Sequence, residues 1–440
     1  MKRFILILVA ASMIGGCGIV GGKGKKKVTP TVGERISVLS GEKEIEVDPE
    51  LASIAVTIPA ATLNTEWAQP GGNASKSIGH VALAPTVAQA WRVSIGAGGT
   101  NKGQLAAAPV VGGGKIFTID SQAVVRALSP ENGATLWRTQ VRGEGATDAI
   151  LFGGGVSYDN GRLYATNGAG YAAALDANTG AVLWQVRPGG PLRGAPTLAN
   201  ENVYVVSQDN QLFALSPADG AVRWTGAAAL EIAGVFGSGA PAAAQGTVVA
   251  GFSSGELNAY RYENGRVLWQ DALARTSIST AVTTLSDIDA DPVIDGGRVY
   301  AVGQGGRMVA LELVTGQRVW EINVAGTATP WVAGDWIYVV TDRGQLLCIA
   351  RGTGRIRWLT QLRRYRDEKD KKGSIGWVGP VLAGDRLIVA NSLGEISHVS
   401  PIDGSVQSTV ATGQRISLTP VVANNTLNIL YDSGLLTAWR

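Results

Sequence analysis

Hydrophobic and polar residues alternate in short runs along most of this chain, and polar turns separate the runs. Residues 211–215 form one alternating run, the turn 216–220 follows, and residues 221–224 form the next run. Alternation with a period of two is typical of strands, and glycine at the end of the turn supplies the positive φ that such a turn needs. Two further apolar runs, 194–197 and 202–206, precede this pair. The pattern therefore predicts a unit of four strands, denoted A to D in chain order.

The end of this unit is repeated along the chain. An apolar pair is followed by a glycine and then, four residues later, by a tryptophan; the glycines stand at 133, 180, 220, 265, 316, 354 and 404. They lie about 40 to 50 residues apart, which is the length of a four-stranded propeller blade. In the last copy Ser408 replaces the tryptophan. We predict that the tryptophans near the start of each strand D dock one blade on the next: Trp91, Trp137, Trp184, Trp224, Trp269, Trp320 and Trp358.

The two ends of the repeat region complete each other. Residues 88–92 resemble a strand D without A, B or C before it, whereas residues 418–439 resemble A, B and C without a D after them. Pairing the two fragments removes the exposed sheet edges of an open ring. We therefore predict an all-β fold, an eight-bladed propeller whose last blade is closed by the N-terminal strand. The alternative is a ring of seven blades with two frayed ends.

The first residues read as a targeting segment. Lys2 and Arg3 precede an apolar run, and small residues precede Cys17. The run 14–17 resembles a bacterial lipobox, which implies cleavage before Cys17, acylation of that cysteine and, with Gly at position 18, the outer membrane. We predict a signal peptide at 1–16, a lipidated cysteine, tether and non-propeller segment at 17–84, and the propeller at 85–440. The alternative at Cys17 is an ordinary signal peptide.

Charge and loop length narrow the range of partners. The formal net charge is +3, or +1 without Lys2 and Arg3 (3 − 2 = 1), which argues against nucleic acid as the main partner. The connections 226–239, 270–291 and 359–378 are long and all join a strand D to the next strand A, so we expect them on one face. The charged run 363–372 is either a solvated loop or a partner contact.

Two of these connections are candidate protein-binding loops. The first carries an apolar group and the second carries carboxylates, and an apolar patch beside carboxylates is typical of a protein interface. The residues are Leu230, Ile232, Val235 and Phe236 in the first, and Asp287 and Asp289 in the second. The first loop could instead fold over its own blade. The aspartates begin like a calcium loop, but Pro292 stands where glycine is expected, so an EF-hand is excluded.

Over residues 86–440 the repeat resembles that of the pyrroloquinoline-quinone (PQQ) dehydrogenases and their non-enzymatic relatives. That resemblance implies a calcium site beside the quinone, a catalytic carboxylate and, commonly, adjacent cysteines that form a disulfide ring. The cysteines here are Cys17 and Cys348, and the histidines, His80 and His398, have no metal-ligand spacing. We therefore expect no quinone, no metal site and no enzymatic activity.

Lipobox, tether and propeller together resemble the BamB family, lipoprotein subunits of the machinery that assembles β-barrels in the outer membrane. The resemblance implies binding to the periplasmic POTRA domains of BamA and assistance to unfolded outer-membrane clients. In that family the contacts lie in two neighbouring loops, an apolar one with an arginine and one with the pattern Leu-Ser-Asp-x-Asp. Residues 285–289 match the second, whereas residues 230–236 match the first only in kind, since they contain no arginine.

Two other functions stay open on the sequence. One is a periplasmic PQQ-dependent oxidoreductase, and the other is a propeller scaffold of another envelope complex. If the BamB resemblance holds, the double change Asp287→Arg with Asp289→Arg is expected to abolish co-purification with BamA and to leave the melting temperature nearly unchanged.

Overall fold

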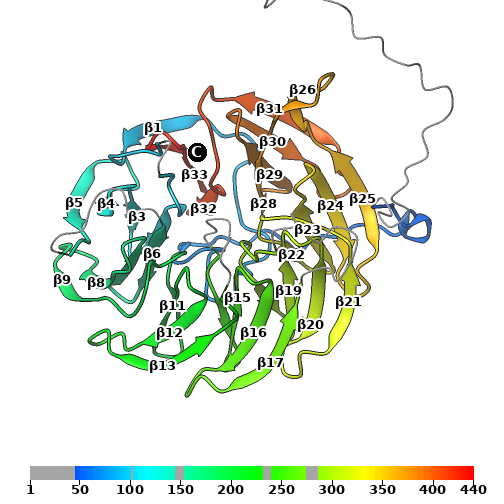
Figure 1. Ribbon diagram of the computed structural model, residues 1–440. Coiled ribbons are helices and arrows are strands. Elements are labelled where there is room, and N and C mark those ends of the chain that lie inside the picture. The colour runs from blue at the N-terminus through cyan, green and yellow to red at the C-terminus, as the bar shows by residue number, and fades with distance from the viewer. Residues whose placement is uncertain (1–44, 101–102, 144–152, 231–238, 274–285) are drawn as a thin grey trace, which may run out of the picture. The chain divides into compact units, whose positions relative to one another are not determined.

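The structure is a computed structural model, and it describes residues 45–100, 103–143, 153–230, 239–273 and 286–440. These residues belong to one compact unit, Ile45–Arg440. Within the described ranges the fold is almost entirely β, and the one helical element is the single turn η1 (Pro49–Leu51). Eight four-stranded antiparallel sheets are arranged around a central axis (Figure 1). The predicted all-β propeller of eight blades is therefore confirmed.

Blades 1 to 7 use their strands in chain order from the axis outward, as A, B, C and D, whereas strand D of blade 8 comes from the N-terminal end of the repeat region. Blades 1 to 4 consist of β2 (Val110–Gly112), β3 (Lys115–Ile119), β4 (Val124–Leu128) and β5 (Thr135–Gln140); β6 (Gly154–Asp159), β7 (Arg162–Asn167), β8 (Ala172–Asp176) and β9 (Val182–Val186); β10 (Thr197–Ala199), β11 (Asn202–Val206), β12 (Gln211–Leu215) and β13 (Val222–Ala227); β14 (Ala242–Ala244), β15 (Thr247–Gly251), β16 (Glu256–Arg261) and β17 (Val267–Ala272).

Blades 5 to 8 consist of β18 (Val293–Asp295), β19 (Arg298–Val302), β20 (Met308–Glu312) and β21 (Arg318–Ile322); β22 (Trp331–Ala333), β23 (Trp336–Val340), β24 (Gln345–Ala350) and β25 (Ile356–Gln361); β28 (Trp377–Ala383), β29 (Arg386–Asn391), β30 (Glu395–Val399) and β31 (Val406–Ala411); β32 (Val421–Ala423), β33 (Thr426–Leu430) and β34 (Leu435–Trp439) with β1 (Gln89–Ser94). A hairpin of β26 (Tyr365–Asp367) and β27 (Lys372–Ser374) lies in the connection between blades 6 and 7.

Blade 8 is built from both ends of the repeat region. Strand β1 pairs antiparallel with β34, with Gln89 opposite Trp439 and Ser94 opposite Leu435. In Figure 1 the blue-cyan β1 accordingly lies beside the red strands of the C-terminal blade. The prediction that an N-terminal strand closes the last blade is therefore confirmed.

The repeated tryptophans lie at the junctions between blades. Each indole N–H donates to a backbone carbonyl of the next blade at 2.8–3.1 Å. The pairs are Trp91 with Pro130, Trp137 with Ala177, Trp184 with Pro217, Trp224 with Tyr262, Trp269 with Leu313, Trp320 with Arg351, and Trp358 with Pro401. The same contact is therefore present at seven of the eight junctions between blades.

The repeated glycine completes this contact, as Gly265 illustrates. Its φ is +69°, and a Cβ there would lie 2.5 Å from Cε3 of Trp224. A side chain at this position is disfavoured twice, because the backbone is left-handed and because the indole occupies the space. We call this contact between the repeated glycine of one blade and the repeated tryptophan of the preceding blade the joint.

The junction between blades 7 and 8 lacks this joint. Ser408 lies opposite His398 in the register where Trp358 lies opposite Cys348 in the preceding blade. All six residues of β31 are exposed. Blade 8 takes its strands C and D from opposite ends of the repeat region, so it has no C-to-D turn with a glycine to receive an indole. Loss of the tryptophan here follows from the way the ring is closed.

Residues 59–83, which we call the axial segment, belong to the predicted non-propeller segment 17–84 and lie against the inner strands of the blades. Between Asn64 and Val81 the segment makes a hydrogen bond to strand A of every blade, in the order 8, 1, 2, 3, 4, 5, 6, 7. The partners are Asn64 with Val422, Trp67 with Val111, Ala68 with Tyr158, Gln69 with Leu198, Ala74 with Ala243, Ser75 with Ile294, Gly79 with Trp331, and Val81 with Leu382. The axial segment therefore makes one circuit of the axis.

Candidate functional site

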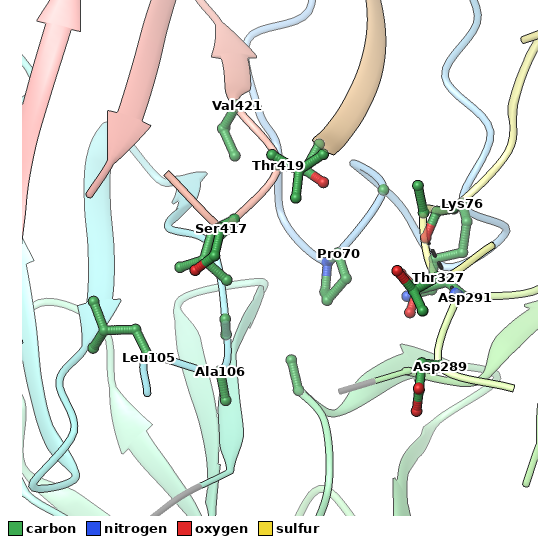
Figure 2. Close-up of a pocket in the computed structure, with 18 of the residues that line it drawn as sticks. Pro70, Lys76, Leu105, Ala106, Asp289, Asp291, Thr327, Ser417, Thr419 and Val421 are labelled. Atoms are coloured by element: carbon green, nitrogen blue, oxygen red, sulfur yellow. Dashed lines mark hydrogen bonds between the residues drawn. The ribbon is translucent and has the colours of Figure 1, made fainter. Parts of the chain in front are cut away.

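A cavity of about 390 Å³ lies on the axis (Figure 2). Its walls come from the ends of the D-to-A connections and the first residues of the A strands, and the axial segment contributes Trp67, Pro70, Gly71 and Lys76. Because its walls come from the D-to-A connections, the cavity lies on the face of the ring where those connections emerge.

The two sides of the cavity differ in polarity. Figure 2 shows Lys76, Asp289, Asp291 and Thr327 on one side, and Leu105 and Ala106 on the other. The polar side holds the charged residues of the site. Charged groups rarely lie in a protein interior without partners, so the partners of each are described in turn.

Asp289 is held by an arginine from another blade connection. Arg193 Nη2 lies 2.9 Å from Asp289 Oδ1, and both side chains are more than nine-tenths buried. Gln304, on the B-to-C turn of blade 5, donates to the other carboxylate oxygen. Burial raises the pKa of Asp289 to about 6, although Arg193 acts to lower it. Asp289 is therefore a partly compensated carboxylate at the cavity wall.

Asp287 lies in the same connection and is 1% exposed. Its backbone carbonyl accepts a hydrogen bond from the N–H of Gln304 at 2.9 Å, and its charge adds to the upward shift of the pKa of Asp289. Neither aspartate side chain lies on the open surface. Because both carboxylates are buried, we expect that replacing them by two arginines lowers the melting temperature, in contrast to the small change expected from the sequence.

A second buried pair lies deeper, where the axial segment meets the wall. Lys76 is 3% exposed, and its Nζ donates to Thr197 Oγ1 at 3.1 Å. Burial lowers the pKa of Lys76 to about 8, and the nearby Asp291 carboxylate opposes that shift. The pKa of Asp291 is raised by its own burial and held back by Lys76. Each charge is thus the main electrostatic compensation of the other.

Asp291 also joins the two candidate binding loops. Its Oδ1 accepts the N–H of Ala240 at 2.7 Å, so the connections before blades 4 and 5 are tied together. Leu230, at the start of the first of these connections, is 70% exposed. Ile232, Val235 and Phe236 lie outside the described residues. Within the described part, the two loops emerge on the same face of the ring.

Sequence reasoning missed Arg193 and Lys76. Arg193 follows Leu192 in the D-to-A connection before blade 3, two connections before the one that carries Asp289. No sequence signal marks Lys76, because it lies in a segment without a repeat and contacts residues far away in the chain.

The two cysteines differ in what the structure says of them. Cys17, the predicted lipidation site, lies outside the described residues, and Cys348 is a buried free thiol. In the part of the chain that is described, no group of three or more His, Cys, Asp or Glu residues is placed to hold a metal ion. The same residues include no helix of the length and apolarity that crossing a bilayer requires.

Sequence comparison identifies relatives over most of the chain. A family model described as "Outer membrane protein assembly factor BamB" matches residues 74–151 and 121–360. The proteins of that name from Yersinia pestis and Escherichia coli K12 are each 27% identical to this chain, over 356 and 354 residues. Both alignments cover 79% of this chain and 88% of the relative.

Solved structures show the same fold at lower identity. The crystal structure of BamB from Moraxella catarrhalis has a TM-score of 0.65 at 20% identity and covers 81% of this chain and 100% of its own. A europium-containing methanol dehydrogenase has a TM-score of 0.67 at 15% identity, covering 83% and 89%. The fold is thus shared with enzymes, whereas the family match spans more than half of the sequence. The chain belongs to the family of the outer membrane protein assembly factor BamB.

Proposed function

We propose that this chain is a lipid-anchored scaffold at the periplasmic face of the outer membrane that binds the POTRA domains of BamA and assists unfolded barrel proteins. Its relatives are named as outer membrane protein assembly factors, and this chain is such a factor rather than an enzyme. The POTRA contact, the clients and the lipid anchor are our proposals.

One observation supports the position of the contact. The hydrogen bond from Ala240 to Asp291 ties the loop that begins with Leu230 to the loop that carries Asp287 and Asp289. The described ends of two neighbouring loops are thus held together, and such preorganisation lowers the cost of binding a partner. The bonded ends lie beside the axial cavity, whose wall includes Asp289 and Asp291.

Leu230→Arg is the direct test, because Leu230 is exposed and its replacement leaves the buried aspartates untouched. We expect the detergent-solubilised variant to capture at least tenfold less BamA than the unchanged protein, since a cation would have to be desolvated at an apolar contact. The measurement is co-purification of BamA, with circular dichroism to verify folding.

Val314→Arg is the matched control. Val314 is 76% exposed and lies in the C-to-D turn between β20 and β21, so it is on the opposite face. Equal capture by the unchanged protein and both variants would remove the loop from the interface. Equal losses in both variants would point to a general charge effect and would also contradict the proposal.

The anchor has its own test. Cys17→Ser should remove the protein from the outer-membrane fraction, because acyl chains contribute roughly 0.8 kcal/mol per buried CH₂ and serine receives none. A Cys348→Ser variant should stay in the outer-membrane fraction, because Cys348 is a buried core thiol. Retention of the Cys17 variant in the outer-membrane fraction would contradict the lipid anchor.

A further inference from the structure

The axial cavity has features of a ligand site that the partner-binding loops do not use. Its volume of about 390 Å³ lies within the roughly 300–1,000 Å³ of small-ligand sites. Its lining is mixed: apolar residues, which include Leu105, Leu418 and Val421, occur together with charged and hydroxyl-bearing residues such as Lys76 and Asp291. A lining that combines apolar surface with convergent polar groups is typical of binding cavities.

Lys76 has hydrogen-bonding capacity left over. An ammonium group has three N–H donors, and in the described part of the chain the one hydrogen bond of Lys76 Nζ goes to Thr197 Oγ1. No carboxylate of a described residue lies within 4.0 Å of it. Lys76 is 3% exposed and lines the cavity. A group bound in the cavity can therefore accept hydrogen bonds from the remaining N–H donors of Lys76.

Asp291 offers the complementary capacity. Its Oδ1 accepts from Ala240, while Oδ2 makes no hydrogen bond to a described residue. A carboxylate accepts up to about four hydrogen bonds, so this side of the cavity presents acceptors next to the donors of Lys76. Since these two charges compensate each other, the best match is a neutral group with one acceptor and one donor, such as a peptide group.

The ring already binds extended chain at this place. Each strand A is the inner edge of its sheet and has one neighbour within the blade. Trp67 forms an antiparallel bridge with Val111, and Val81 forms a parallel bridge with Ala383. The inner edges therefore accept extended backbone in either direction, as sheet edges do in strand addition.

We propose that the axial cavity binds a short extended segment of an unfolded polypeptide, with a backbone carbonyl on the Lys76 ammonium and a backbone N–H on the Asp291 carboxylate. Apolar side chains of the segment contact Leu105, Leu418 and Val421. The peptide site follows from the cavity and its polar groups. That the bound segment belongs to an unfolded outer-membrane protein rests on the proposed function.

The test uses the full-length protein in detergent and a fluorescein-labelled octapeptide of alternating threonine and leucine with both ends capped. Fluorescence anisotropy gives the Kd. Thr419→Trp, which fills the cavity from its wall, should abolish saturable binding. Lys76→Met should raise the Kd about tenfold, the effect of losing one hydrogen bond to a charged group.

Two controls isolate the backbone contact. Lys115→Met removes a partly exposed lysine that bonds Asn178 away from the cavity, and it should leave the Kd unchanged. The same peptide with N-methylated alternate amides should bind at least tenfold more weakly to the unchanged protein. Equal binding of both peptides would overturn recognition of the backbone.

Wild-type affinity in Thr419→Trp would overturn the cavity as the site. Wild-type affinity in a folded Lys76→Met would mean that Lys76 and Asp291 bind solvent only, which would also overturn the proposal. If Lys76→Met fails to fold, the results with Thr419→Trp and with the methylated peptide test the proposal.

BamA capture by Thr419→Trp should match that of the unchanged protein. Peptide binding without BamA capture would leave this inference standing while the proposed function fails.

Discussion

The rim and the axis of this propeller are stabilised by different means. At the rim, one apolar joint of tryptophan and glycine recurs at seven junctions, always between neighbouring blades. At the axis, buried charges such as Arg193 and Asp289 pair across non-neighbouring connections, and each pair occurs once. Repetition therefore builds the ring, whereas the part suited to specific recognition is made of contacts that do not repeat.

The largest expected effect is at the rim. Trp224→Ala should lower the free energy of unfolding by about 3–5 kcal/mol, because it opens a cavity between blades 3 and 4 and leaves the Tyr262 carbonyl with only the long hydrogen bond from Asn202 Nδ2 at 3.4 Å. Ser408→Ala, at the same register in the junction that has no joint, should change it by less than about 0.5 kcal/mol. Urea unfolding followed by tryptophan fluorescence measures both, and equal losses would mean that the joints do not stabilise the ring.

At the axis, Arg193→Met should cost about 2–3 kcal/mol. The change leaves Asp289 buried without its cation, and uptake of a proton by that carboxylate limits the loss. Arg261→Met breaks an exposed pair with Glu263 at the rim and should cost at most about 1 kcal/mol. Thermal unfolding at pH 7 compares the two. A larger loss in Arg261→Met would reverse the contrast between axial and rim charges.

The smallest expected effect is a dependence on pH that arises at the axis. Burial raises the pKa of Asp289 to about 6, so the folded state binds a proton that the unfolded chain, with a pKa near 3.8, has released. The contribution of the Asp289 carboxyl group to the free energy of unfolding is fully present below about pH 4 and is lost as the pH rises through 6. The decrease from pH 4.5 to 7.5 should be on the order of 1 kcal/mol and should be smaller in Asp289→Asn.

Asp403 at the rim provides the contrast. Hydrogen bonds from the Ser405 N–H and from the Ser400 and Ser405 side chains lower the pKa of Asp403 to about 2. It stays ionised over this range, so Asp403→Asn should leave the pH profile between 4.5 and 7.5 unchanged. A profile that follows Asp403 instead of Asp289 would place the titrating group at the rim.

The same contrast explains how much the sequence could predict. The eight blades and the closure by β1 followed from a pattern repeated at a fixed period, so each copy supported the reading of the others. The axial segment has no such support: Asn64 bonds Val422 across 358 residues of chain, and its burial depends on a ring that must already be present. Asp287 and Asp289 were found by their motif, but their burial depends on Arg193, which is 96 residues from Asp289.

Closure of the ring by β1 and β34 also affects how the chain is made and delivered. Strand β1 emerges early during synthesis and translocation, but its partner emerges only with residues 435–439. A chain that stalls between these points has two bare sheet edges, which are templates for aggregation. Holdase chaperones and proteases of the envelope should therefore discriminate sharply between unfinished and finished chains.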